Sequence, residues 1–285
     1  MLRFPVICSG GIGDTLIKLA AVPIAAWGRL GVRFNLFYSE RGHPAWKVLE
    51  GFLASLEYCR LVARPPSLTE MRIRNLWKRV LPYSSVLYAP PIPQREVSDS
   101  HPASAKRILL QSHLDGHHGH TSVWAKKWPV NRWCELAESL HRDGWAVELL
   151  EWDPPSFEAI VRACPFIQDA RRRTLLETVQ RMRAASCVVS VDSWTKYVAG
   201  WWKIPQVVIV ADLRKGYTPD FQNMTADQVA RGWFRGLTGS PTTRLLGLEK
   251  KRNGFEYTLP SLELLSVQQV KAAVIQVSNS SDFEN

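Results

Sequence analysis

The sequence predicts an α/β fold made of two Rossmann-like lobes whose parallel sheets face each other across a cleft. Short apolar runs alternate with segments of helical periodicity, an order typical of parallel strands joined by helices. A stretch rich in proline and serine at 82–105 interrupts this alternation, which restarts after it. We therefore expect an N-terminal lobe at 1–100, a C-terminal lobe at 101–277 and a disordered tail at 278–285.

The N-terminal lobe opens with a strand, a glycine turn and a helix. Phe4–Cys8 is a short apolar run, and helical periodicity extends over Thr15–Leu30 until Gly31 ends it. Val32–Tyr38 alternates apolar and polar residues as a strand does, and Pro44–Leu56 has helical periodicity again. This order predicts a parallel sheet with crossover helices.

The C-terminal lobe repeats the alternation. The expected strands are Arg107–Gln111, Gly144–Leu150, Cys187–Val191 and Gln206–Val210. The expected helices are Val130–Asp143, Ser156–Ala163, Leu175–Ala185 and Thr195–Trp202. In open α/β sheets, ligands bind at the carboxyl ends of the strands, so we expect the site there, in the cleft between the lobes.

Composition and charge narrow the classes of function. The 285 residues carry 36 Lys and Arg against 26 Asp and Glu, a formal net charge of +10. This excess of cations predicts an anionic partner such as a nucleotide, a phosphorylated lipid or nucleic acid. No apolar run reaches the roughly 20 residues of a membrane-spanning helix and no signal-peptide pattern opens the sequence, so we expect a cytoplasmic protein.

Five scattered cysteines indicate neither a disulfide framework nor a structural zinc site. Their number is odd, and none forms a Cys-x-x-Cys pair. We interpret all of them as reduced thiols: Cys8, Cys59, Cys134, Cys164 and Cys187.

A glycine turn that joins the first strand to the first helix contains a carboxylate. The turn reads Gly10-Gly11-Ile12-Gly13-Asp14, and backbone amides at a helix start attract an anion. Its spacing matches neither the dinucleotide fingerprint nor the P-loop. Asp14 is placed to act either as a helix cap or as a general base. The turn therefore predicts an anion site or a purely structural turn.

A loop rich in histidine follows the strand Arg107–Gln111. Four histidines lie within His113–His120, a number that suggests a metal site, although no zinc spacing is matched. The residues after them supply hydroxyls and cations that suit a diphosphate better: Thr121, Ser122, Lys126 and Lys127. A solvated polar loop is the third interpretation.

Asp192 and Ser193 end the strand Cys187–Val191 just before a helix begins. Their side chains fit an N-terminal helix cap, and the same geometry cradles a phosphate. Both interpretations stay open on these residues alone.

Together, these three segments resemble glycosyltransferase family 9, the ADP-heptose:lipopolysaccharide heptosyltransferase type. The first loop of that family carries Gly-Asp before a helix with a proline, matched here by Gly13-Asp14 and Pro23. Its Lys-x-Trp-Pro stretch is matched by Lys126–Pro129, with Lys127 at the variable position. Its signature Asp-Ser-Gly-x-x-His-x-Ala-Ala-(x)4-Pro aligns without gaps to Asp192–Pro205. The resemblance spans roughly residues 6–210.

The resemblance implies a GT-B fold, a donor nucleotide-sugar held by the C-terminal lobe, an acceptor held by the N-terminal lobe and no metal requirement. It implies that Asp14 takes the proton of the acceptor hydroxyl in an inverting transfer and that Lys126 neutralises the leaving diphosphate. No cofactor is implied beyond the donor, for which an ADP-sugar is favoured. The other donor-binding residues it implies are Gly11, Gly13, Thr121, Ser122, Lys127, Glu158, Asp192, Ser193, Trp194, Thr195 and Tyr197.

Two positions depart from the family pattern. Trp194 stands where the family has glycine, and Tyr197 stands where it has histidine. A bulky indole narrows the approach of the backbone to a diphosphate. These departures support an alternative hypothesis, a non-catalytic protein that binds a nucleotide-sugar.

A basic amphipathic segment marks the N-terminal lobe. Within Met71–Leu81, apolar residues recur at helical spacing with basic residues between them, a pattern that suits a phosphorylated lipid, a membrane surface, a DNA backbone or an ordinary surface helix. The expected acceptor-binding residues are Arg60, Arg64, Arg72, Arg74 and Lys78. We expect as acceptor a phosphorylated glycolipid such as lipopolysaccharide core, reached by peripheral contact with the inner membrane. Phage DNA with hydroxymethylated bases is the alternative acceptor.

Overall fold

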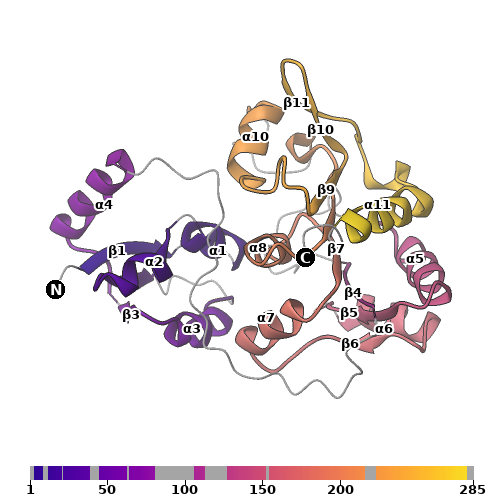
Figure 1. Ribbon diagram of the computed structural model, residues 1–285, viewed down its shortest axis with the longest axis horizontal. Coiled ribbons are helices and arrows are strands. Elements are labelled where there is room, and N and C mark those ends of the chain that lie inside the picture. Colours follow the sequence, from indigo (N-terminus) through magenta and orange to yellow (C-terminus); the bar gives the residue numbers. More distant parts are fainter. Residues whose placement is uncertain are drawn as a thin grey trace. The chain divides into compact units, whose positions relative to one another are not determined.

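Figure 1 shows the computed structural model, which describes residues 3–8, 12–20, 22–38, 45–62, 64–80, 106–112, 127–151, 154–215 and 223–280. A few side chains within these ranges, those of Asp14, Arg74 and Lys78 among them, lie outside the description. The chain divides into two units. The first comprises Met1–Ser98 and Arg172–Gln180, and the second comprises Asp99–Arg171 and Arg181–Asn285.

The first unit is built on three parallel strands in the order β1-β2-β3. β1 (Arg3–Cys8) pairs with β2 (Arg33–Tyr38), and β2 pairs with β3 (Cys59–Val62). The central strand β2 supplies the large buried side chains Phe34 and Phe37. The helices of this part of the chain are α1 (Ile12–Ala20), α2 (Ile24–Arg29), α3 (Ala45–Ser55) and α4 (Leu68–Val80).

The helix expected at Thr15–Leu30 is two helices, so this prediction is wrong in detail. α1 begins earlier, at Ile12, and the break between α1 and α2 falls near Val22 and Pro23. Proline lacks an amide hydrogen and its ring clashes with the preceding turn, so a helix ends before it. The amide of Ile24 instead donates to the carbonyl of Val22 at 2.8 Å, and the helix restarts from this tight turn.

The second unit contains a six-stranded parallel sheet in the order β6-β5-β4-β7-β8-β9. Its strands are β4 (Arg107–Gln111), β5 (Ala146–Leu149), β6 (Gln168–Asp169), β7 (Cys187–Val191), β8 (Gln206–Ile209) and β9 (Thr243–Leu246). The helices after β4 are α5 (Val130–Arg142), α6 (Pro154–Ala163), α7 (Leu175–Arg183), α8 (Thr195–Trp201), α10 (Ala226–Trp233) and α11 (Val267–Ser280). Figure 1 shows α5 and α11 on one side of these strands and α8 on the other. Among the described helices, none is both long and apolar enough to cross a membrane.

The central strands of this sheet are buried along their whole length. Every residue of β4, β7 and β8 is buried, because helices cover both faces of a parallel sheet of this kind. Their sequences are therefore nearly unbroken apolar runs, which is why their positions are predictable from the sequence. The predicted α/β class, with a parallel sheet in each of two units, is confirmed.

The strand order places a switch point between β4 and β7. From β4 the chain proceeds outward through β5 to β6, and it then returns to add β7, β8 and β9 on the other side of β4. In doubly wound sheets, ligands bind outside the carboxyl ends of the strands at such a switch point. The residues that directly follow β4 and β7 are therefore expected to contact a ligand.

The end of the chain holds elements that the sequence pattern does not predict. β10 (Leu248–Lys251) and β11 (Gly254–Tyr257) form an antiparallel hairpin after β9. α11 continues through Ser280, so the expectation of disorder from Ser278 onward is wrong for 278–280. Residues 281–285 lie outside the described part of the chain.

All five cysteines are free thiols, as the sequence predicts. Cys8 lies at the end of β1 and Cys187 at the start of β7, and both are buried. Burial disfavours the charged thiolate and raises the pKa of each of these two thiols to about 12. Both therefore stay protonated over the physiological pH range.

Candidate functional site

Buried polar side chains gather at the carboxyl edge of the six-stranded sheet. They follow four different strands, and each is 6% exposed or less: Ser112 after β4, Glu151 after β5, Asp192 and Ser193 after β7, and Asp212 after β8. We call these five residues the carboxyl-edge cluster. β4 and β7 are paired, with Gln111 opposite Ser190, so the cluster is centred on the switch point. Buried polar groups concentrated at strand ends are typical of a ligand site.

Asp192 forms an ion pair with Lys196 instead of capping α8. The Lys196 ammonium donates to Asp192 Oδ1, and both side chains are almost fully buried. The helix N-cap is Trp194, which makes no side-chain capping hydrogen bond, so the predicted cap at Asp192 and Ser193 is wrong. Asp192 and Lys196 are four residues apart, which places them on the same side of the helix start. The Asp192 carboxylate neutralises a buried cation that would otherwise be costly.

Aromatic rings complete the surroundings of Lys196. Its ammonium lies 4.3 Å from the centre of the Phe234 ring and 4.6 Å from that of the Tyr197 ring. Rings at these distances stabilise a cation through their negative faces. The Tyr197 hydroxyl donates to the carbonyl of Trp233 at 2.9 Å, so this side chain is part of the interior packing of the second unit.

A second polar contact ties together the ends of β4 and β5. The Ser112 hydroxyl donates to the Glu151 carboxylate, and both residues are buried. The two strands are neighbours in the sheet, and the amide of Leu150 donates to the carbonyl of Leu110 at 2.8 Å just before them. This contact orients a carboxylate at the edge of the cluster.

Tyr257 of the hairpin brings a phenol close to two carboxylates of the cluster. Arg214 binds Asp212 through two hydrogen bonds, Nε to Oδ1 at 2.8 Å and Nη2 to Oδ2 at 2.7 Å. The Tyr257 ring lies 5.2 Å from the Arg214 guanidinium. Burial raises the pKa of Tyr257 strongly, and the charges of Asp192 and Asp212 raise it further. Tyr257 therefore stays protonated and can donate a hydrogen bond.

Two further hydroxyls beside the cluster lack hydrogen-bond partners among the described residues. Ser190 Oγ lies in β7 and Thr195 Oγ1 lies at the first position of α8, and both residues are fully buried. Buried hydroxyls are normally satisfied by protein, water or a ligand. Their position next to Asp192 agrees with a polar ligand at this edge.

The charges of the described cluster suit hydroxyl groups better than phosphates. Three carboxylates, those of Glu151, Asp192 and Asp212, face two cations, Lys196 and Arg214. Carboxylates accept hydrogen bonds from sugar or ribose hydroxyls. A diphosphate needs additional cations, and the sequence offers them at Lys126 and Lys127.

The predicted donor-binding residues fall into three groups. Asp192, Ser193 and Thr195 lie together at the buried edge, and Trp194 beside them is partly exposed. Glu158 is exposed on α6, and Lys127 is exposed just before α5. Gly11, Thr121, Ser122, Lys126 and the histidine loop His113–His120 lie outside the described residues.

The tryptophan of the Lys-x-Trp-Pro stretch has a structural role. Trp128 is buried, and its indole N–H donates to the carbonyl of Leu265 at 3.0 Å. Its ring packs edge-on against Trp133, with the centroids 5.0 Å apart. The start of α5 is thereby fixed to the segment that leads into α11, which holds the neighbouring Lys127 at a defined position.

The predicted catalytic Asp14 belongs to the first unit. It is the third residue of α1, the helix that follows the carboxyl end of β1, and Gly13 directly precedes it. The next residue, Thr15, is fully buried, and its hydroxyl lacks a partner among the described residues. The first turn of a helix attracts negative charge on a bound group and stabilises a carboxylate of its own.

Of the predicted acceptor-binding residues, Arg60 and Arg72 are exposed, on β3 and α4. Arg64 has a partner of its own: two hydrogen bonds of 2.9 Å join it to Glu70, and it stacks over the Phe37 ring at 5.2 Å. The hydrogen bonds from Arg64 lower the pKa of Glu70 to about 2. The structure thus shows Arg64 fastening the start of α4.

No group of three or more histidine, cysteine, aspartate or glutamate side chains suited to a metal ion occurs among the described residues. The histidine loop is outside this part of the chain, so the metal interpretation of that loop stays a prediction.

Several residues of the site escape sequence reasoning. Lys196, Ser112, Glu151, Asp212 and Tyr257 are not among the predicted residues, although the first four lie within five residues of a strand end. Ser112, Glu151 and Asp212 are polar residues that closely follow predicted strands, and this position is the sequence signal that marks them. Tyr257 has no such signal, because the hairpin that carries it is not apparent in the sequence pattern.

A family model matches the part of the chain that contains this cluster. Residues 93–230 match the model of glycosyltransferase family 9, the heptosyltransferases. The chain carries a glycosyltransferase family 9 domain. The matched range includes β4, β7 and the whole carboxyl-edge cluster. The family resemblance predicted from the sequence is therefore confirmed, and with it the class of enzyme, a glycosyltransferase.

Solved structures of glycosyltransferases share the fold of this chain. ADP-heptose LPS heptosyltransferase II of E. coli is 14% identical, with a TM-score of 0.59 over 99% of this chain and 100% of that chain. E. coli heptosyltransferase WaaC with ADP is 15% identical, with a TM-score of 0.54 over 97% and 100%. The iron-containing dodecameric glycosyltransferase TibC of enterotoxigenic E. coli is 14% identical, with a TM-score of 0.52 over 98% and 76%. No curated protein sequence matches this chain.

Proposed function

We propose that this protein is an inverting glycosyltransferase that moves a heptose or a related sugar from a nucleotide-diphosphate sugar to a hydroxyl of a phosphorylated glycolipid. The observation that carries the proposal is the family 9 match over residues 93–230, which contains the buried carboxyl-edge cluster. A non-catalytic binding protein would need no catalytic carboxylate, and the experiment below separates the two.

The donor binds at the carboxyl edge of the six-stranded sheet. The carboxylates of the cluster accept hydrogen bonds from ribose or sugar hydroxyls, and Tyr257 donates one. Lys126 and Lys127, together with the hydroxyls of Thr121 and Ser122, contact the diphosphate. WaaC has been solved with ADP, which supports an ADP-sugar as the donor.

The reaction is a displacement at the anomeric carbon. The acceptor oxygen forms a bond to that carbon as the bond between the carbon and the diphosphate oxygen breaks. The electron pair of the broken bond leaves with the nucleoside diphosphate, whose negative charge Lys126 stabilises. Asp14 takes the proton of the acceptor hydroxyl, and attack from the face opposite the leaving group inverts the anomeric configuration.

The transfer needs no bound metal in this proposal, because lysines and helix amides supply the positive charge that the leaving diphosphate requires. TibC contains iron, which makes metal dependence a necessary arm of the test. Activity that persists in EDTA supports the metal-independent mechanism, and activity that is lost in EDTA and restored by a metal ion contradicts it.

The acceptor is anionic and contacts the first unit. Arg60 and Arg72 are exposed there, and the net charge of +10 favours a phosphorylated partner. A phosphorylated glycolipid supplies both the phosphates and the hydroxyl, and its position at a membrane surface would bring the basic helix α4 into peripheral contact with that surface.

Replacement of Asp14 tests catalysis directly. We expect Asp14→Asn to lower turnover of the sugar donor by about 100-fold or more while the affinity for the nucleoside diphosphate stays within about twofold, because a general base acts on the transition state and not on donor binding. The measurement is release of the nucleoside diphosphate in the presence of phosphorylated lipopolysaccharide core or hydroxymethylated DNA.

Asp227→Asn is the matched control. Asp227 lies in the first turn of α10 and pairs with Arg231, so its replacement also removes a carboxylate from a helix start. Full activity of Asp14→Asn would contradict the proposed base. Turnover with hydroxymethylated DNA and not with the glycolipid would show that DNA is the acceptor.

A further inference from the structure

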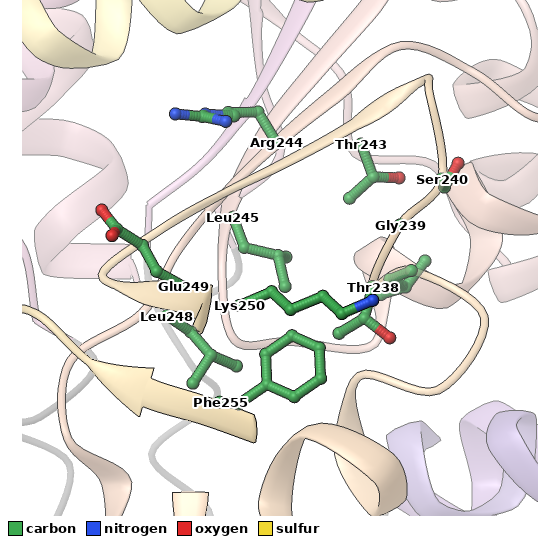
Figure 2. A pocket seen from close by; sticks show the side chains of 11 residues that line it. Thr238, Gly239, Ser240, Thr243, Arg244, Leu245, Leu248, Glu249, Lys250 and Phe255 are labelled. Atoms are coloured by element: carbon green, nitrogen blue, oxygen red, sulfur yellow. The ribbon is translucent and has the colours of Figure 1, made fainter. Parts of the chain in front are cut away.

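A polar pocket lies between the edge strand β9, the hairpin β10–β11 and the segment that follows α10 (Figure 2). Its volume is about 450 Å³, within the range of small-molecule sites. The lining combines hydroxyls, charged side chains and an aromatic ring, and none of it belongs to the carboxyl-edge cluster. The residues central to the pocket are Thr238, Gly239, Ser240, Thr243, Lys250 and Phe255.

Lys250 supplies an exposed cation to the lining of this pocket. Its side chain runs beside Phe255, and its ammonium ends next to Thr238 (Figure 2). Lys250 and Phe255 are directly opposite each other in the hairpin. In the part of the chain that the structure describes, the Lys250 ammonium forms no ion pair. Its charge is therefore available to an anion.

The neighbouring charges do not cancel that of Lys250. Glu249 also lines the pocket, but its carboxylate binds the Lys251 ammonium at 2.6 Å. That hydrogen bond and the charge of Lys251 lower the pKa of Glu249, so the carboxylate stays ionised and paired at neutral pH. Arg244 lines the pocket as well and adds a second positive charge. The balance of charge in the pocket is positive.

Hydroxyl donors and open space accompany the cation. Thr238 and Ser240 lie in the segment between α10 and β9, and Thr243 is the first residue of β9. Gly239 between them has φ +82°, and a side chain placed there would meet no atom within 4 Å. Hydroxyl side chains and an ammonium that line one pocket form a donor set that suits a phosphate group.

The other wall of the pocket is apolar. Phe255 is partly exposed, and Leu245 and Leu248 line the pocket with it. An inorganic phosphate fills only a small part of 450 Å³ and leaves this wall in contact with water. A sugar ring packs its C–H face on an aromatic ring, and aromatic side chains supply such contacts at binding sites. The pocket therefore suits a phosphate carried on a sugar-sized group.

The pocket and the carboxyl-edge cluster lie at different places in the sheet. β9 is the edge strand, separated by β8 from β7. Neighbouring strands are about 4.8 Å apart, which puts β9 about 10 Å from β7. Thr243 and Arg244 are the first two residues of β9 and so mark its amino end, whereas the cluster follows the carboxyl ends of β4, β5, β7 and β8.

We propose that this pocket is a second ligand site, which binds a phosphomonoester of sugar size. The Lys250 ammonium and the Thr238 hydroxyl hold the phosphate, and Phe255 packs against the sugar ring. The site is independent of the proposed donor site, because no residue is shared between them.

Calorimetric titration of the full chain with glucose 6-phosphate and with inorganic phosphate tests this proposal. The titrations are run with and without saturating ADP at constant ionic strength, so that phosphate groups bound at the donor site are not counted. We expect Lys250→Met to weaken binding of both ligands about tenfold or more, since it removes a charge-assisted hydrogen bond. We expect Phe255→Ala to weaken binding of glucose 6-phosphate and to leave inorganic phosphate unchanged.

Lys251→Met is the matched control. Lys251 is the next residue and carries the same charge, but it does not line the pocket; its ammonium pairs with Glu249. Equal weakening by Lys250→Met and Lys251→Met would show general charge attraction and overturn the proposal, as would absence of binding at 10 mM of either ligand. Equal affinity for both ligands with no effect of Phe255→Ala would overturn the sugar part and assign the pocket to phosphate alone. A donor site that fails to bind ADP changes none of these outcomes.

Discussion

A single buried carboxylate, Glu148 of β5, pairs with two buried arginines of the second unit. Its carboxylate binds Arg107 Nε of β4 at 2.9 Å, and it binds Arg181 of α7 through two bonds of 2.9 and 2.6 Å. The Glu148 side chain is 1% exposed, and those of Arg107 and Arg181 are 8% and 6% exposed. Removal of one partner from such a group leaves a charge in the interior without compensation.

We expect Glu148→Gln to destabilise the second unit by about 3–5 kcal/mol, because two guanidinium groups then stay buried beside a neutral amide. The measurement is urea unfolding followed by circular dichroism. Asp143→Asn is the control, since Asp143 forms a partly exposed pair with Lys271 at 2.8 Å, and pairs of that kind contribute about 0–1 kcal/mol. Equal effects of the two variants would contradict this account of Glu148.

The start of α4 shows how local contacts define an element. Ser67 and Glu70 form a capping box, with the amide of Ser67 donating to Glu70 at 2.7 Å and the amide of Glu70 donating to Ser67 Oγ at 3.3 Å. Arg64 adds two hydrogen bonds to the same carboxylate. The ionised form of Glu70 is therefore the one that holds the helix start together.

The pH dependence of this contact follows from the direction of the pKa shift. The hydrogen bonds from Arg64 lower the pKa of Glu70 from 4.5 to about 2, so the contribution of Glu70 to stability is complete above about pH 4.5 and is lost as the pH falls through about 2. We expect the Glu70 carboxyl resonance to titrate near pH 2 in an NMR experiment and to move back toward 4.5 in Arg64→Met. A midpoint near 4.5 in the unmodified protein would show that the pair does not form.

The fold elements that the sequence predicts well are those in which burial decides the pattern. β7, Cys187–Val191, is predicted with its observed bounds because every position is buried and four of the five residues are apolar. β6, Gln168–Asp169, is not predicted, because two exposed polar residues at the sheet edge carry no pattern. β10, Leu248–Lys251, is not predicted either, since three of its four residues are exposed and charged.

Prediction of the candidate site stops where a contact depends on distant parts of the chain. Asp192 is found from the sequence because it follows a clear strand, but its partner Lys196 is not, since spacing alone does not show that a lysine is buried. The influence of Asp192 on Tyr257 depends on a hairpin that has no strong sequence signal. The role of Trp128 also depends on a carbonyl at Leu265, far along the chain.

The whole molecule consists of two units, each with a parallel sheet, and a fully buried thiol lies in each. Cys8 is in the first unit and Cys187 is in the second, and burial raises the pKa of each to about 12. An unfolded chain exposes both thiols, and their pKa returns to about 9. Between these values the unfolded state loses protons that the folded state keeps, so stability falls as the pH rises from about 9 toward 12.

We expect the free energy of unfolding to decrease by about 1 kcal/mol per pH unit above pH 9 for each of these thiols. The measurement is the urea midpoint at pH 8, 9, 10 and 10.5. Cys187→Ala is expected to make the dependence on pH shallower, because the substituted residue does not titrate. Stability that is constant up to pH 10.5 would contradict the prediction.

The central claim is that the second unit binds the nucleoside diphosphate of a sugar donor, with Lys126 at the diphosphate. Calorimetric titration of the purified chain with ADP, UDP and GDP tests it most directly. We expect one of the three, with ADP favoured, to bind clearly and to lose affinity about tenfold or more in Lys126→Ala, whereas Lys203→Ala, an exposed lysine beyond α8, leaves it unchanged. No binding of any of the three, or binding that Lys126→Ala and Lys203→Ala affect equally, would contradict the account.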